Sequence, residues 1–60
     1  MAYPLSELFR CSMQSAHGYA QLVNEKSLPQ EEREYFYSMM LYMCDNARQA
    51  LHRAAQAAQN

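Results

Sequence analysis

The sequence contains little of what strands and irregular loops require. Its 60 residues include one glycine, two prolines and a single valine, and isoleucine and threonine do not occur. β-Branched residues favour strands, whereas alanine, glutamine, methionine and leucine, which are abundant here, favour helices. This scarcity excludes a β-rich fold and predicts an all-α chain. A chain of this length forms one domain at most.

Neither sign of charge is in large excess, because five Lys and Arg residues oppose six Asp and Glu residues. Nucleic-acid surfaces need clustered basic residues and membrane-surface segments need a basic run, so neither is indicated. The longest apolar run, 35–44, would span about 15 Å as a helix, roughly half of a bilayer core. We therefore expect no membrane partner. The first residues lack the pattern of a secretory signal, which predicts a cytoplasmic location.

The patterns of catalytic and metal-binding sites are missing as well. No glycine-rich phosphate loop or nucleophile motif occurs. Neither His17 nor His52 has a second metal ligand at the i+4 spacing of a helix. The acidic residues gather around the middle of the chain, where capping of a helix accounts for them. We therefore expect a non-enzymatic protein without a cofactor or a metal.

Two helical patterns are present, with one break between them. The sequence predicts a first helix over about 4–24, a loop over about 25–27 and a second helix over about 28–58. Ser27 and Gln30 have the spacing of a capping box, and Pro29 suits the first turn of the second helix. Glutamates follow this start and basic residues lie toward the other end, as the helix dipole favours. Gly18 interrupts the first pattern and either permits a close helix contact or is simply tolerated.

Apolar and small residues recur at alternating spacings of four and three, which places them on one stripe of each helix. The first stripe is Leu5, Phe9, Ser12, Ala16, Tyr19 and Val23. The second stripe is Phe36, Met40, Met43, Ala47, Ala50, Ala54 and Ala57. A short loop between two helices implies an antiparallel hairpin. If facing positions sum to about 55, Tyr19 lies against Phe36 and Ala16 lies against Met40. A shift by one heptad is the alternative register.

The run YFYSMMLYMC, residues 35–44, is apolar on all sides of its helix. Four of its residues fall outside the stripe that faces the first helix: Tyr35, Tyr37, Leu41 and Tyr42. A contiguous exposed patch of this kind is uncommon in a soluble monomer. We expect these four residues to form an interface, most simply by pairing two hairpins into a homodimeric four-helix bundle. The alternative is that a different protein covers them.

The two cysteines are expected to be reduced. In the hairpin Cys11 and Cys44 would lie at the same height but on opposite flanks, so a disulfide would require the helices to rotate. Without a secretory signal, reduced thiols are also the usual state.

A polar stripe on the outer face of the first helix is the remaining candidate site. Its central members are Arg10, Gln14, His17 and Gln21. A dimeric bundle of such hairpins resembles, in length and topology, the repressor-of-primer family of plasmid proteins. That family binds paired RNA loops through polar and basic residues of its first helices. The resemblance implies an RNA partner held by these four residues. Phosphate binding needs several cations, and Arg10 is the one firm cation of the stripe.

We therefore expect a small intracellular interaction module that dimerises and binds another protein as its regulator or inhibitor. Its expected partners are a second copy of the chain and an unidentified protein. RNA binding is the second hypothesis. A purely structural role as a subunit of a larger assembly is the third.

Overall fold

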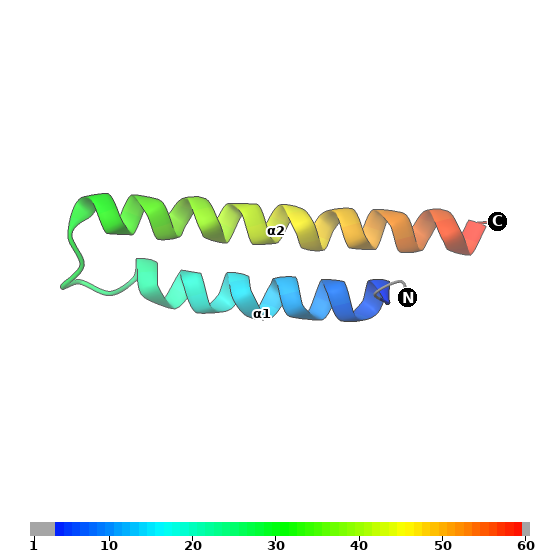
Figure 1. Ribbon diagram of the computed structural model, residues 1–60, viewed down its shortest axis with the longest axis horizontal. Helices are drawn as coiled ribbons and strands as arrows, with labels where there is room; N and C mark the ends of the chain where they lie inside the picture. The colour runs from blue at the N-terminus through cyan, green and yellow to red at the C-terminus, as the bar shows by residue number, and fades with distance from the viewer. Residues whose placement is uncertain (1–3, 60) are drawn as a thin grey trace.

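The computed structural model describes residues 4–59 and contains two helices packed against each other. Helix α1 covers Leu5–Val23 and helix α2 covers Gln30–Gln59. They run antiparallel and are joined at one end by a single loop (Figure 1). No strand occurs within residues 4–59. The predicted all-α helical hairpin is confirmed.

Both helices begin immediately after a proline. The backbone N–H of Leu8 donates to the carbonyl of Pro4 at 3.0 Å, and that of Arg33 donates to the carbonyl of Pro29 at 3.0 Å. Each proline thus occupies the position before the first helical residue rather than the first turn. α2 starts two residues later than we expected, because a residue that precedes proline, here Leu28, is sterically disfavoured in the α conformation.

The loop is held by Arg33 rather than by the expected capping box. The Ser27 hydroxyl donates to the carboxylate of Glu25 at 3.3 Å, and α2 begins only at Gln30. The Nη2 atom of Arg33 donates to the backbone carbonyls of Glu25 at 3.0 Å and Lys26 at 3.5 Å. The guanidinium therefore ties the first turn of α2 to the chain that leads into it.

The two helices meet along the predicted stripes. The buried residues within 4–58 are Ser12, Ala16, Ala47 and Ala50, all of which belong to those stripes. The rings of Tyr19 and Phe36 stack with their centroids 6.1 Å apart. This contact confirms the register in which facing positions sum to about 55. We call these two stripes the inter-helix seam.

Gly18 does not serve the close approach of the helices. A Cβ atom added at this position would meet no atom within 4 Å, apart from the neighbouring backbone of its own helix. The structure therefore supports the second interpretation of Gly18, in which the helix simply tolerates a glycine at this position.

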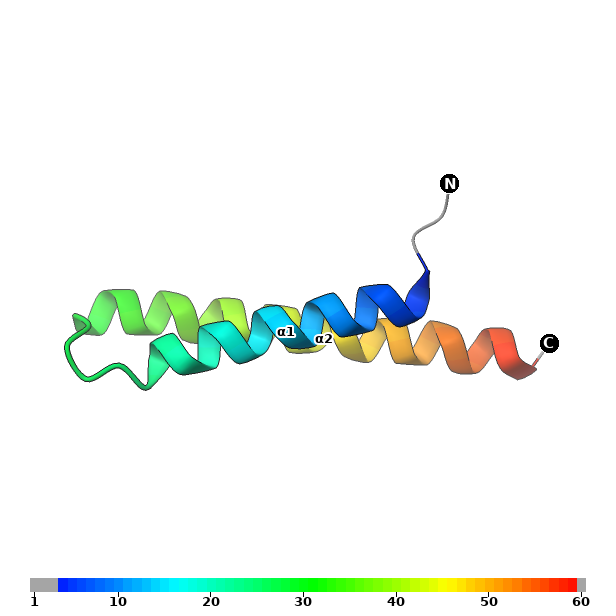
Figure 2. The ribbon, with the colours of Figure 1, turned by 90° about the horizontal axis from the view of Figure 1, so that it is seen from below.

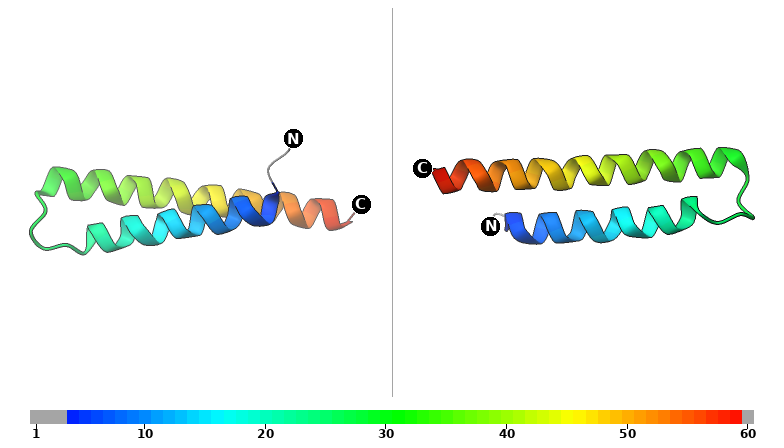
Figure 3. Two further views of the ribbon diagram at one scale, coloured as in Figure 1. Left: turned by 60° about the horizontal axis from the view of Figure 1, so that its bottom comes forward. Right: turned by 180° about the vertical axis from the view of Figure 1, so that it is seen from behind.

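The hairpin is long and thin. Its Cα atoms extend over 48 × 16 × 16 Å, and their radius of gyration is 14.1 Å. A compact domain of this length would have a radius of about 10 Å. The helices cross at a shallow angle, as Figure 2 shows from below and Figure 3 from two further sides. α2 also extends past the start of α1, so its final turns have no helix beside them (Figure 1). This shape leaves most side chains in contact with solvent.

Candidate interaction surfaces

The four residues predicted to form an interface are all exposed on the hairpin. Their exposed fractions are 59% for Tyr35, 49% for Tyr37, 49% for Leu41 and 58% for Tyr42. Three more large apolar residues within 4–59 are exposed: Met13, Leu22 and Leu51. Packing of the two helices therefore leaves about half of each of these seven residues exposed and available to another molecule.

The four predicted residues do not form one patch. Each residue of an α-helix is rotated by about 100° from the preceding one, so Tyr37 and Leu41 project close together, as do Tyr35 and Tyr42. The two pairs fall on opposite sides of the seam residue Phe36. The sequence prediction placed the four residues outside the seam, on the flanks and back of the second helix, without dividing them between two sides.

One side of the hairpin carries most of the exposed apolar groups. In an antiparallel helix pair, the residues that directly follow corresponding seam positions lie on the same side of both helices. Met13 follows Ser12, Tyr37 follows Phe36, and Leu51 follows Ala50. Cys44, which is exposed, and Leu41 join them on α2. We call Met13, Tyr37, Leu41, Cys44 and Leu51 the Tyr37 flank.

The opposite side carries a smaller aromatic patch. Leu22 precedes the seam residue Val23, and the rotation of the helices places it on the same side as Tyr35 and Tyr42. The ring of Tyr35 also packs edge-on against Phe36, with centroids 5.5 Å apart. We call Leu22, Tyr35 and Tyr42 the Tyr35 flank. Its tyrosines combine an apolar ring with a polar tip, as is common in protein interfaces.

The polar stripe of α1 is exposed as expected, and its side chains interact with one another. The guanidinium of Arg10 forms an ion pair with Glu7, and His17 Nε2 lies 3.3 Å from Gln21 Nε2. The hydrogen bond and charge of Arg10 lower the pKa of the Glu7 carboxyl below its usual value of 4.5. Gln14 completes the exposed stripe. The carboxylate of Glu7 reduces the positive charge that this face offers to a phosphate.

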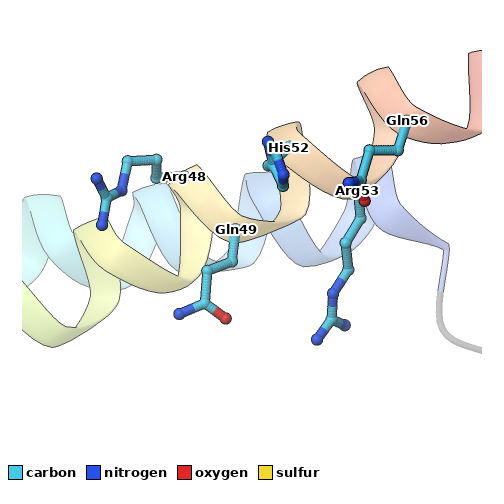
Figure 4. Close-up of a pocket in the computed structure, with 5 residues that line it drawn as sticks. All are labelled: Arg48, Gln49, His52, Arg53 and Gln56. Atoms are coloured by element: carbon cyan, nitrogen blue, oxygen red, sulfur yellow. The ribbon is translucent and has the colours of Figure 1, made fainter. Parts of the chain in front are cut away.

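A basic surface on the second half of α2 was not singled out as a site from the sequence. Five side chains line a shallow hollow there: Arg48, Gln49, His52, Arg53 and Gln56 (Figure 4). Arg48 donates to Asp45 at 2.6 Å and Gln49 donates to the same carboxylate at 2.7 Å. These bonds, that of Arg48 first, lower the pKa of Asp45 below its usual value of 3.8. The spacing of Arg48, His52 and Arg53 along one helix was the feature of the sequence that could have indicated this basic surface.

A second hollow lies where α2 leaves the loop, and it is lined by Val23, Gln30, Arg33, Glu34, Tyr37 and Ser38. The Nε atom of Arg33 is buried without a hydrogen-bond partner, whereas its Nη2 atom holds the loop. The contact of Nη2 with the loop gives Arg33 a structural role, so its position beside this hollow does not by itself indicate a binding site.

Neither cysteine is part of a disulfide. Within the part of the chain that the structure describes, no three His, Cys, Asp or Glu residues are grouped so that they could hold a metal ion. Neither described helix is long and apolar enough to cross a membrane.

We compared the chain with protein-family models, with curated proteins and with solved structures, and none of them matched.

Proposed function

We propose that this chain is a non-enzymatic interaction module, which pairs with a second copy of itself and binds another protein as its regulator or inhibitor. The observation that carries this proposal is the division of the exposed apolar residues between two flanks of a hairpin that has almost no core of its own.

The small core supports a need for a partner. The buried apolar residues within 4–59 are Ala16, Ala47 and Ala50, and no large side chain there is fully buried. Burial of a complete Leu or Phe side chain contributes about 1.5–3 kcal/mol, and alanines contribute much less. Domains of this size usually gain the missing stability from a disulfide, a metal or association. The cysteines here form no disulfide. Association is therefore the favoured source.

The accessible surface supports the same conclusion by its size. A compact monomer of 7.0 kDa is expected to expose about 4,000 Å². The hairpin exposes 4842 Å², which is about 800 Å² more. One partner in a standard protein interface also buries about 800 Å². The excess reflects the elongated shape of the hairpin and is comparable to the surface that one partner contributes to a standard interface.

The second flank supports the regulatory part of the proposal. A closed dimer that buries one side of the hairpin leaves the other side in solvent, and both sides carry large apolar residues. A dimer would therefore present two identical aromatic patches outward. Tyrosine is among the residues that most often supply the binding energy of a protein interface.

Light scattering on a size-exclusion column, over a series of concentrations, tests self-association. We expect a mass near 14 kDa, twice the 7.0 kDa of one chain. A helical monomer of 7.0 kDa at every concentration would overturn the proposal that the chain pairs with itself.

Site-specific photocrosslinking tests the second binding event. A benzophenone side chain in place of Tyr42, on the Tyr35 flank, should give an adduct with one other protein in the cells that make this chain. The control places the same group at His52, which is exposed and is rotated by about 80° from Tyr42 around α2. If the Tyr42 position yields only adducts between copies of this chain, the Tyr35 flank serves self-association and the regulatory proposal fails.

A further inference from the structure

α2 contains a second repeat of the kind that packs helices together. Starting at Tyr37, residues recur at spacings of four, three, four, three and four: Tyr37, Leu41, Cys44, Arg48, Leu51 and Ala55. This is the alternation that marks the seam with α1. All six residues are exposed on the hairpin. α2 therefore carries one stripe for α1 and a second, unused stripe along the Tyr37 flank.

Five members of the second repeat, from Tyr37 to Leu51, are symmetric about Cys44 to within one residue. Cys44 lies at the middle of α2, which covers Gln30–Gln59. Tyr37 and Leu51 are each seven residues from Cys44, and Leu41 and Arg48 are three and four residues from it. If two copies of α2 run antiparallel with Cys44 facing Cys44, Tyr37 of each copy lies level with Leu51 of the other. The repeat thus fits a second copy of itself.

The charges of α2 are complementary in the same arrangement. Its first half, residues 30–44, contains three glutamates and Arg33, whereas its second half, residues 45–59, contains Asp45 with Arg48 and Arg53. With His neutral, the halves carry formal charges of −2 and +1. An antiparallel pair places the acidic half of each copy beside the basic half of the other, whereas a parallel pair places like charges together. Charge complementarity of this kind mainly selects orientation.

We propose, on the basis of the self-association above, that the second copy docks antiparallel on the Tyr37 flank, with Cys44 of the two copies meeting at the two-fold axis. α1 adds Met13 to the same face, so whole hairpins stack with α2 against α2 and α1 against α1. Cys44 at the axis then meets its own counterpart, and every other contact between two residues occurs twice, as a closed two-fold interface requires. One copy in a standard interface buries about 800 Å².

Cross-linking through the thiols tests the location of the interface. Each of the two maleimide rings of a bismaleimide adds one thiol. A short spacer between the rings therefore joins two thiols only when they lie close together. In the Cys11→Ser variant we expect a covalent dimer as the main product, and in the Cys44→Ser variant we expect its loss. Cys11 is the matched control because it lies on the opposite side of the hairpin. Circular dichroism establishes that both variants keep their helices.

A mixing experiment tests the orientation. In a chain that also carries Cys11→Ser and Cys44→Ser, Tyr37→Cys and Leu51→Cys are made as separate variants. An antiparallel pair brings position 37 of one copy level with position 51 of the other, and it holds the two copies of position 37 about 21 Å apart along the helix. We therefore expect covalent dimers when the two variants are mixed and none when either is treated alone.

The outcomes separate this proposal from the one on which it rests. If light scattering gives a dimer but cross-links form through Cys11, or form with either position 37 or position 51 alone, the chain self-associates in another geometry and the antiparallel docking is overturned. If light scattering gives a monomer at every concentration, self-association and this docking both fail.

Discussion

Replacement of Leu41 by alanine isolates the contribution of the Tyr37 flank to dimerisation. Leu41 is 49% exposed on the hairpin, so about half of its side chain remains to be buried by a second copy. Full burial of a Leu side chain contributes about 1.5–3 kcal/mol, and half of it contributes about 0.7–1.5 kcal/mol. A two-fold interface contains two copies of Leu41, which doubles the loss to about 1.5–3 kcal/mol per dimer. The dissociation constant of the Leu41→Ala dimer should therefore be about 10 to 150 times that of the parent dimer.

Leu22→Ala is the matched control. It removes the same atoms from a leucine that is 41% exposed, but on the Tyr35 flank. Alanine has the highest helix propensity, so neither variant should lose helix content. Sedimentation equilibrium over a dilution series measures both dissociation constants. Equal weakening by the two variants, or an unchanged dissociation constant for Leu41→Ala, would refute the assignment of the dimer interface to the Tyr37 flank.

Three further changes test the hairpin itself. Gly18→Ala should raise the free energy of unfolding by up to about 1 kcal/mol in thermal melts, because an added Cβ meets no atom within 4 Å and alanine is the better helix former; a loss of stability would mean that Gly18 lies in a close contact. Ala50→Leu should lower the free energy of unfolding by about 1–3 kcal/mol in urea titrations, because Ala50 is 1% exposed in the inter-helix seam and a larger side chain must push the helices apart. Asp45 has a pKa below 3.8 in the folded chain, so its ion pair stabilises the fold above about pH 3.8 and this contribution disappears as the pH falls through the lower folded value. Asp45→Asn should therefore lose less helicity than the parent chain on acidification below pH 3.8, as followed by circular dichroism.

The helical hairpin could be predicted from the sequence because its stripes are set by residue spacing alone. The alternation of four and three residues selected Ser12, Ala16, Ala47 and Ala50, which are the buried residues of the described chain. The register in which facing positions sum to about 55 also gave the contact between Tyr19 and Phe36. These features follow from the periodicity of the helix and the volumes of side chains, which a single sequence displays.

Local capping and the division of the surface were harder to predict. The Ser27–Gln30 spacing suggested a capping box, but the steric effect of Pro29 on Leu28 delays the helix, and Arg33 takes over the loop carbonyls. Both outcomes depend on three-dimensional competition between neighbouring groups. The division of the predicted interface between two flanks, in contrast, does not depend on such competition. The rotation of about 100° per residue already separates Leu41 from Tyr42, so the two flanks and the second repeat of α2 were present in the sequence.

The chemistry of the two flanks fits two different kinds of partner. The Tyr37 flank combines two leucines, a methionine and a thiol with a single tyrosine, so it is the more aliphatic of the two surfaces and fits an interface that remains closed. The Tyr35 flank has two tyrosines, whose hydroxyls are satisfied by water when no partner is bound, so this surface tolerates the free state. Pairing of copies through both flanks would leave an unsatisfied flank at each end and would continue into open chains. Closure through the Tyr37 flank alone avoids this polymerisation and keeps the Tyr35 flank for a different protein.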